Sequence, residues 1–369
     1  MERLGPEHAE PIQDFFAREW GGDGAGSDGS GEVDPREPAL DFSTPQWICL
    51  RNGEAIGYLG TIPVVFRVGG ERLSATWLKG FWVTEKYRSG PVGPMLLKQA
   101  VSELDLIGSQ VVAPAARRVQ ESEGFTHRCT LFNRVLLVRA HRVLGRVDLQ
   151  QVVPGSVPAP LRTVAKVLQT VGVMSIAGGV AGLCIRGLGR IADAGSRAYT
   201  VRGGWDIDDH ALDDLWARLR DQVHTTPDRA AESLRDRYEG DGKHDLYSVW
   251  SGDTLEGWSV LRRPAASTDP RLSGLRVASI ADVFYPIGEP RVGTAALRAA
   301  EDGARRHGAD AVLCSGSHPA LQRLVAHRGY LTFPANVLIM ARDGVAHAFA
   351  TGGENMWVTR GDARSDEGF

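Results

Sequence analysis

The sequence predicts a mixed α/β protein with two tandem domains, each a mixed and largely antiparallel sheet flanked by helices. The chain has 369 residues, the length of about two ordinary domains. The sequence also matches itself when it is displaced by 200 residues. In each copy, a run of strand-like segments precedes alternating helix-like and strand-like segments. This order is typical of a mixed sheet covered by helices.

The internal repeat is indicated by residues that match in order along both copies. The segment "DFFAREW" at 14–20 falls on "DLWARLR" at 214–220, and both read as amphipathic helices. The matches that follow are Gly57 with Gly257, Val83 with Val283, Val92-Gly93 with Val292-Gly293, Leu97 with Leu297, and Gly108 with Gly308. After a short slip, 114–125 falls on 319–330. We therefore expect an internal duplication.

The elements of the first copy follow from its hydrophobic pattern and turn residues. After the N-terminal helix we expect strands near 46–51, 54–67 and 71–84, a helix at about 89–106, the strand "SQVVA", a helix at 115–123 and the strand "CTLFNRVLLV". The second copy repeats this order with the strands "LYSVW", "TLEGWSVLRR" and "LRVASIADVFY", a helix at about 292–307, the strand "ADAVLCS", a helix at 318–327 and the strand "FPANVLIMA".

The predicted organisation is an N-terminal domain at 1–140, a helical apolar linker at 141–200, a C-terminal domain at 201–345 and a tail at 346–369. The tail is polar from about 359 and is expected to be frayed. Residues 21–38 are rich in Gly, Asp and Ser, which predicts a mobile loop that is either a lid or plainly disordered.

Within the linker, 167–185 carries no charged residue, and three interpretations stay open. Its length is enough to span a bilayer. Basic residues flank both sides, however, so the flanks give no orientation, and a single span would place the two copies in different compartments. A buried or inter-domain helix is favoured over contact with a membrane surface, and both are favoured over a true span.

Composition narrows the function classes. The formal net charge is −3, so no basic field is present to attract nucleic acid. The four cysteines lie far apart without a Cys/His cluster, which argues against a metal site. The first residues, "MERLGPEHAEPIQDFF", are acidic and lack an apolar core, so we expect no signal peptide and a cytoplasmic protein.

The stretch "FWVTEKYRSGPVGPMLLKQAV" at 81–101 reads as a strand, a tight loop and a helix. A loop that opens a helix presents free backbone N–H groups and the positive end of the helix dipole, which suit a phosphate. An ordinary strand-to-helix turn explains the same glycines and prolines.

Each copy resembles the GCN5-related N-acetyltransferase family, over about 10–137 and 205–342. The family motif is a strand ending in Val, four residues, Arg or Gln, and then a Gly-containing loop that opens a helix. Val83, Arg88 and Gly93 fit this spacing, and "ESEGF" is similar to the family's Gly-Phe turn before the last strand. The whole chain looks like a tandem member.

The resemblance implies an acyl-CoA site, with acetyl-CoA or another acyl-CoA as co-substrate. The residues that would hold the cofactor are Val83, Arg88, Ser89, Gly90, Val92, Gly93 and Pro94. Loop N–H groups would bind the pyrophosphate, and the amide-rich pantetheine arm would pair with the strand edge as an added strand does. A backbone N–H near Val83 would stabilise the oxyanion.

Several positions depart from the family pattern. Pro91 replaces the first motif glycine and removes one N–H donor, although Gly90 offers a way to shift the turn. Gln120 and Val325 stand where many members have a tyrosine that acts as general acid, and Trp77 stands where many have a glutamate base. In the second copy, Gly288 replaces the arginine and Glu289 would repel a phosphate, so this copy is expected to have lost the cofactor.

The resulting hypothesis is an acyl-CoA-dependent N-acyltransferase that transfers an acetyl group to an amine of a small molecule or sugar. Asp282 and Glu85 are the weak candidates for the catalytic carboxylate, with a strand-end contact and a solvated surface group as the respective alternatives. The alternatives for the whole chain are an inactive binding or scaffold protein with this fold, or an aminoacyl transferase of the FemABX type.

Overall fold

The computed structural model describes residues 1–20, 42–146, 198–267, 269, 272–333, 337–344 and 348–365. These residues form two compact units. Unit 1 comprises Met1–Cys129 and Val337–Gly352, and unit 2 comprises Thr130–Asn336 and Gly353–Phe369. The expectations for the loop at 21–38 and the apolar segment at 167–185 lie outside the described residues. None of the helices within the described ranges is long and apolar enough to cross a membrane.

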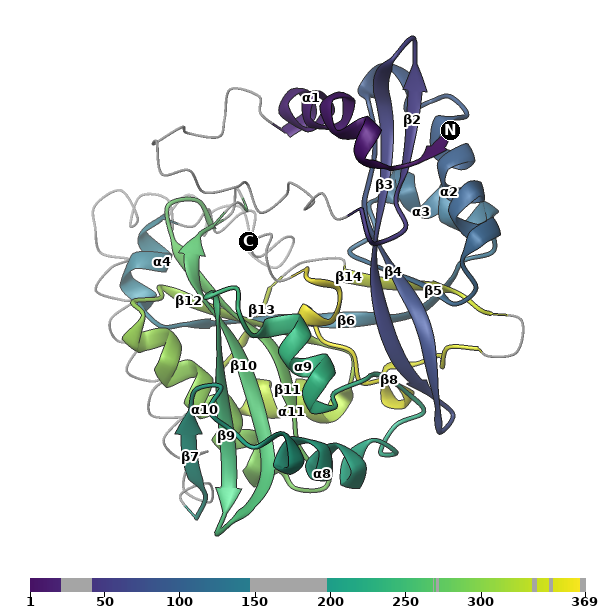
Figure 1. Cartoon of the computed structure of the whole chain (residues 1–369). Coiled ribbons are helices and arrows are strands. Elements are labelled where there is room, and N and C mark those ends of the chain that lie inside the picture. The colour runs from purple at the N-terminus through teal and green to yellow at the C-terminus, as the bar shows by residue number, and fades with distance from the viewer. Residues whose placement is uncertain are drawn as a thin grey trace. The chain divides into compact units, whose positions relative to one another are not determined.

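Unit 1 is built on a mixed sheet in which only one pair of neighbouring strands is parallel. Its strands, in spatial order, are β1 (Glu2–Arg3), β2 (Trp47–Arg51), β3 (Glu54–Val68), β4 (Glu71–Val83), β5 (Ile107–Gln110) and β14 (Val337–Arg342). The parallel pair is β4 with β5, and the other pairs in this order are antiparallel. Figure 1 shows β14 beside β5.

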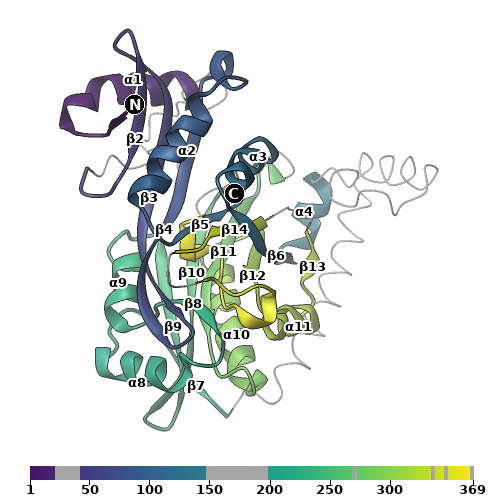
Figure 2. The ribbon, with the colours of Figure 1, turned by 90° about the vertical axis from the view of Figure 1, so that its right-hand side faces the viewer.

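Helices cover both faces of the unit 1 sheet (Figures 1 and 2). The short turn η1 (Pro6–His8) leads into α1 (Ala9–Trp20), which packs on Ile48. On the other face, α2 (Val92–Glu103) and α3 (Pro114–Ser122) pack with Trp47 and Cys49. Because successive side chains of a strand point to opposite faces, these neighbouring residues of β2 serve two separate cores.

Unit 2 has a second mixed sheet, which again contains a single parallel pair. Its strands, in spatial order, are β6 (Thr126–Leu137, within this unit from Thr130), β12 (Ala311–Gly316), β11 (Arg276–Phe284), β10 (Thr254–Ala266), β9 (His244–Ser251) and β7 (Thr200–Gly203). The strand β13 (Leu331–Thr332) also pairs with β6. Here β11 and β12 are the parallel pair.

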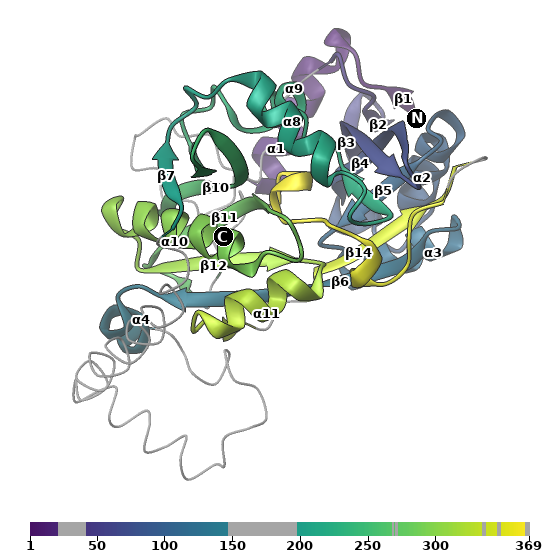
Figure 3. The same cartoon turned by 90° about the horizontal axis from the view of Figure 1, so that it is seen from below.

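The unit 2 sheet is also covered on both faces (Figure 3). On one face lie α8 (Asp209–Leu219) and α9 (Ala231–Tyr238), and on the other lie α10 (Pro290–Arg306) and α11 (Pro319–His327). A short helix, α4 (Ala140–Arg146), follows β6. The remaining elements are β8 (Thr225–Pro227) and the 3-10 turns η2 (Glu85–Tyr87), η5 (Gly353–Asn355) and η6 (Gly361–Ala363).

The two halves of the sequence exchange their last strands. β6 ends the first half but pairs with β12, with Ala311 opposite Leu137. Reciprocally, β14 ends the second half but pairs with β5, with Ile339 opposite Gln110. Each sheet is therefore completed by a strand from the other half of the chain.

Two side-chain contacts recur in both halves, at or within two residues of the positions that the repeat predicts. Arg18 of α1 pairs with Glu54 and donates to the Ala55 carbonyl. In the same way, Arg218 of α8 pairs with Glu256 and donates to the Leu255 carbonyl. The helix that follows the parallel strand also packs on a glycine in both halves. A Cβ atom on Gly57 would lie 2.8 Å from Val92, and one on Gly257 would lie 2.8 Å from Val292.

The predicted fold class is confirmed, and the elements expected in both halves are present with shifts of a few residues at their ends. The prediction of a frayed tail from about 359 is wrong, because Thr359–Asp362 are buried. Their polar side chains suggested exposure, but they are satisfied inside unit 2 by ion pairs to residues far away in the sequence.

Candidate functional site

In unit 1, the parallel strands β4 and β5 pair over a short length only. Residues 76–78 of β4 pair with 107–109 of β5, and β4 then continues to Val83. The register of β4 against β3 shifts near Gly80, whose φ of 69° marks a bulge that re-aims the strand. We call the end of this pairing the unit 1 fork.

The backbone at the end of β4 has a defined direction. The Thr84 N–H donates to the Ile56 carbonyl of β3. Because backbone groups alternate along a strand, those of Val83 and Phe81 point away from β3 and toward the fork. This is the edge with which an added strand or an amide-rich ligand would pair.

The loop after Val83 is closed by Arg88. The Arg88 Nε atom donates to the Val83 carbonyl at 2.9 Å. Its guanidinium group also lies 4.9 Å from the ring centroid of Trp82. Arg88 therefore ties the loop to the end of β4, a structural role in addition to the positive charge that the motif provides.

The supply of backbone donors in this loop is limited. The Gly90 N–H bonds to the Tyr87 carbonyl at 3.0 Å, so this glycine does not replace the donor that Pro91 lacks. The Arg88 N–H bonds to the Glu85 carbonyl at 3.2 Å. Val92 and Gly93 occupy the first turn of α2, where N–H groups have no acceptor within the helix. An anion at this position would be held mainly by these two groups and the helix dipole.

The predicted cofactor residues Val83, Arg88, Ser89, Gly90, Val92, Gly93 and Pro94 all lie between the fork and the first turn of α2. Packing alone does not require a glycine at position 93. A Cβ atom on Gly93 would lie 3.5 Å from Phe81 and 3.8 Å from the Val83 side chain, at ordinary contact distance.

Two of the unit 1 positions that depart from the family pattern, Gln120 and Trp77, are core residues. The Gln120 amide is buried and donates to Ser109 Oγ at 3.0 Å. Trp77 is buried and packs over Gly108. A catalytic base at this position would need access to the substrate, whereas the Trp77 side chain serves the core.

The structure shows a carboxylate at the end of β4 that sequence reasoning missed. Trp82 Nε1 donates to Glu19 Oε2 at 2.8 Å, and the Glu19 side chain is 10% exposed. Burial alone would raise the pKa of Glu19, but the hydrogen bond from Trp82 and the charge of Arg18 lower it overall, which keeps the group ionised at neutral pH. Nothing in the pattern of the N-terminal helix distinguishes Glu19 from other acidic surface residues.

The catalytic candidates Glu85 and Asp282 lie in different units. Glu85 is exposed in the turn η2. Asp282 lies in β11 and is fully buried. Each stays a prediction as a catalytic group.

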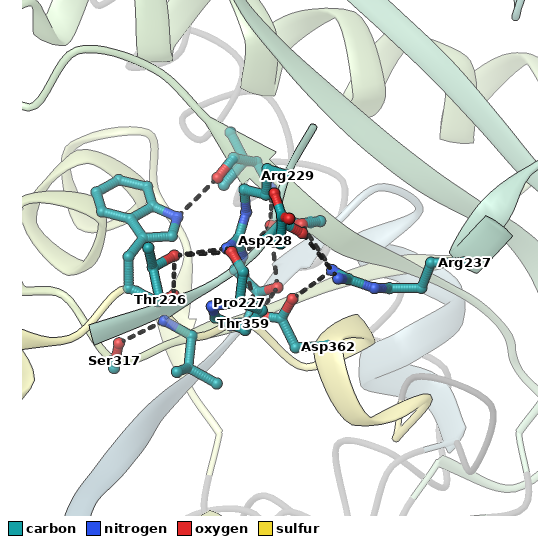
Figure 4. A network of polar contacts seen from close by, with 12 residues as sticks. Thr226, Pro227, Asp228, Arg229, Arg237, Ser317, Thr359 and Asp362 are labelled. Carbon is teal, nitrogen blue, oxygen red and sulfur yellow. Dashed lines mark hydrogen bonds and ion pairs between the residues drawn. The ribbon is translucent and has the colours of Figure 1, made fainter. Parts of the chain in front are cut away.

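Asp282 belongs to a buried network in unit 2, whose partners Arg229 and Asp362 are labelled in Figure 4. Arg229 Nη2 lies 3.0 Å from Asp282 Oδ1 and 2.9 Å from Asp362 Oδ2. Arg237 Nη1 lies 2.6 Å from Asp362 Oδ1. The Thr359 hydroxyl donates to Asp282 Oδ1 at 3.0 Å.

The network is balanced in charge, with two arginines facing two aspartates. Burial raises the pKa of Asp282 to about 6, although Arg229 opposes this shift. The Asp362 charge raises it further, since two carboxylates share one guanidinium. This arrangement holds β11, β8 and the C-terminal segment together.

The register of unit 2 also corrects the alignment of the strand end. Tyr58 pairs with Trp82, whereas Trp258 pairs with Phe284. The structural counterpart of Val83 is therefore Tyr285 and not Val283. Because Val92 and Val292 occupy equivalent positions, the connection into the helix is two residues shorter in unit 2 than in unit 1.

Several solved structures resemble most of the chain. A GCN5-related N-acetyltransferase from Anabaena variabilis matches with a TM-score of 0.55 and 11% identity, over 92% of this chain and 71% of that chain. A probable N-acyltransferase from Enterococcus faecalis matches with a TM-score of 0.52 and 12% identity, over 93% and 71%. The N-myristoyltransferase of Saccharomyces cerevisiae, solved with bound myristoyl-CoA, matches with a TM-score of 0.51 and 12% identity, over 82% and 70%.

Neither a protein-family model nor a curated protein matches the sequence. At these identities the structural likeness concerns the fold, and it extends over both units. The chain therefore has the fold of the GCN5-related N-acetyltransferases.

Proposed function

We propose that the chain is an acyl-CoA-dependent N-acyltransferase whose cofactor binds at the unit 1 fork. The observation that carries this proposal is the coincidence of the fork, the loop at 84–91 and the first turn of α2 at the motif residues. The fold supports it, because the similar structures include a GCN5-related N-acetyltransferase, a probable N-acyltransferase and an N-myristoyltransferase with bound myristoyl-CoA.

The chemistry assigned to unit 1 is direct transfer. A neutral amine attacks the thioester carbonyl, and the oxyanion accepts a hydrogen bond from a backbone N–H at the end of β4. The C–S bond then breaks, and the proton lost by the amine passes through water to the departing thiolate, so that the products are the amide and the free coenzyme A thiol. The N–H groups of Val92 and Gly93 hold the pyrophosphate. Glu19 is the ionised carboxylate that would hold the acceptor amine near Trp82.

The two halves are proposed to be duplicated copies with divided roles. The recurring contacts of Arg18 and Arg218, and of Gly57 and Gly257, support a common origin. The shorter strand-to-helix connection of unit 2 supports the loss of its cofactor site. We propose acetyl as the transferred group and a small amine or amino sugar as the acceptor.

A non-catalytic binding protein with this fold is the second candidate. Pro91 has no N–H, and the Gly90 N–H is engaged within the turn, so the loop offers fewer phosphate donors than the motif implies.

An acyl-transfer assay separates the two. Release of the coenzyme A thiol is followed with acetyl-CoA and with myristoyl-CoA, against spermidine, tyramine and glucosamine as acceptors. Thiol release that depends on the amine supports the acyltransferase proposal. The thioester that reacts faster, acetyl-CoA or myristoyl-CoA, indicates the length of the transferred acyl group. Cofactor binding without amine-dependent release favours the binding protein.

A further inference from the structure

Unit 2 has a fork of its own between β11 and β12. The parallel pairing ends with Ile280 opposite Cys314, whereas β11 runs on to Phe284 and β12 to Gly316. The register of β11 against β10 shifts at Ala281, which marks a bulge at the same point. Unit 2 thus repeats the feature that defines the proposed cofactor edge of unit 1.

The C-terminal segment, 356–362, lies in this fork and bonds to both strands. On the β12 side, Gly316 forms a bridge with Thr359, and the Ser317 N–H donates to the Val358 carbonyl at 2.9 Å. On the β11 side, Trp357 Nε1 donates to the Val283 carbonyl at 3.0 Å. A Cβ atom on Gly361 would lie 2.8 Å from the Ala281 carbonyl, so the segment approaches the strand backbone closely.

The segment is also fixed from the side of β8. The Trp357 N–H donates to the Thr225 carbonyl at 3.0 Å, and the Thr226 hydroxyl donates to the Trp357 carbonyl at 3.1 Å. The Trp357 side chain is 2% exposed. The segment therefore pairs through its backbone and inserts one large side chain, as an added strand does.

Charge makes the fork selective for an acidic ligand. Arg229 and Arg237 both contact Asp362, and Asp282 is the other carboxylate of the cluster (Figure 4). Without Asp362 the two buried guanidinium groups would face one carboxylate. An uncompensated buried charge is strongly unfavourable, so the carboxylate of the segment is part of the binding site.

We infer that the unit 2 fork is a strand-addition site whose ligand is the chain's own C-terminal segment, and that this ligand closes unit 2 to an acyl-CoA. The claim that the segment closes unit 2 to an acyl-CoA rests on the proposed function, because it assumes that the segment occupies the place that the pantetheine arm takes in unit 1. The strand-addition site itself rests on the contacts of unit 2 alone. One acyl-CoA per chain is the consequence.

The test keeps the full chain and cuts it after folding. A protease site placed at 345–347 allows the folded protein to be cleaved, and size exclusion then reports whether the fragment from 348 onward stays bound. Phe349 contacts Phe66 of unit 1, so the comparison between variants carries the test. The variants are Trp357→Ala, Asp362→Asn and the milder Thr359→Val, with Glu354→Gln, an exposed charge in η5, as the control.

The fragment is expected to stay bound in the wild type and in Glu354→Gln, and to dissociate at least tenfold more readily in Trp357→Ala and Asp362→Asn. Thr359→Val keeps the shape of the side chain and covers the case in which Asp362→Asn does not fold. Equal retention in all variants would overturn the strand-addition site.

Calorimetry of the uncut chain with acetyl-CoA tests whether the segment closes unit 2 to an acyl-CoA. Binding at one site supports this claim, and binding at two sites overturns it. Absence of any acetyl-CoA binding would remove the proposed function and leave the fragment result standing.

Discussion

At the scale of single residues, the structure changes the roles of several side chains that the sequence singled out. Arg88 has the charge of a phosphate ligand, yet it also fastens the loop to Val83. Asp282 ends an apolar run, which suggested a site, but it is buried in an ion cluster with Arg229. Glu19 gave no signal in the sequence, because its significance depends on the hydrogen bond from Trp82.

Glu19→Gln tests the carboxylate at the end of β4. The amide keeps an acceptor for Trp82 Nε1 but removes the negative charge, so the KM for the amine is expected to rise about tenfold or more while the acetyl-CoA affinity is unchanged. Steady-state kinetics and calorimetry measure the two quantities. Glu85→Gln, an exposed carboxylate in η2, is the matched control. Equal effects of the two substitutions would remove Glu19 from the acceptor site.

At the scale of elements, hydrophobic pattern and turn residues were sufficient to place most helices and strands. Local signals such as the Gly/Pro loop before Val92 act within a few residues, so the start of α2 could be predicted from the sequence. The exchange of β6 and β14 could not be read, because either strand has the same apolar pattern for both sheets. The burial of the tail was missed for a related reason, since its partners Arg229 and Arg237 are remote in the sequence.

The glycines under the two equivalent helices provide a matched pair of substitutions. In Gly57→Ala and Gly257→Ala, the new methyl group would lie 2.8 Å from Val92 and Val292 respectively. Each substitution is expected to cost about 1–3 kcal/mol of unfolding free energy, because the helix must shift. Denaturant unfolding measures this loss.

Only Gly57→Ala displaces the first turn of α2, so only this variant is expected to weaken acetyl-CoA binding. Equal loss of binding in Gly257→Ala would indicate that the cofactor does not depend specifically on α2.

Strand exchange predicts that neither half of the sequence folds alone. A fragment covering 1–140 lacks β14, and one covering 201–345 lacks β6, so each would leave a strand of its sheet unpaired. Each purified fragment is expected to show no cooperative unfolding by circular dichroism, and a mixture of the two to recover it. Cooperative unfolding of a single fragment would contradict the interdependence of the two sheets.

At the scale of the whole molecule, the two units differ at places that correspond in the strand register. In unit 1 the strand end leads into a loop and a helix N-terminus that suit a phosphate. In unit 2 the connection is shorter, Glu289 precedes the helix, and the C-terminal segment lies in the fork. These differences support the proposed division of roles, in which unit 1 binds the cofactor.

The central claim is that acyl-CoA binds at the unit 1 fork, and calorimetric titration of the intact protein with acetyl-CoA tests it most directly. The wild type is compared with Gly93→Glu and Gly93→Gln. A Cβ atom at Gly93 meets only ordinary contacts, so the two side chains differ mainly in the charge they bring to the helix N-terminus. Micromolar binding at one site, lost in Gly93→Glu and largely kept in Gly93→Gln, is the predicted result. No binding by the folded wild type, or binding that Gly93→Glu leaves unchanged, would contradict the account.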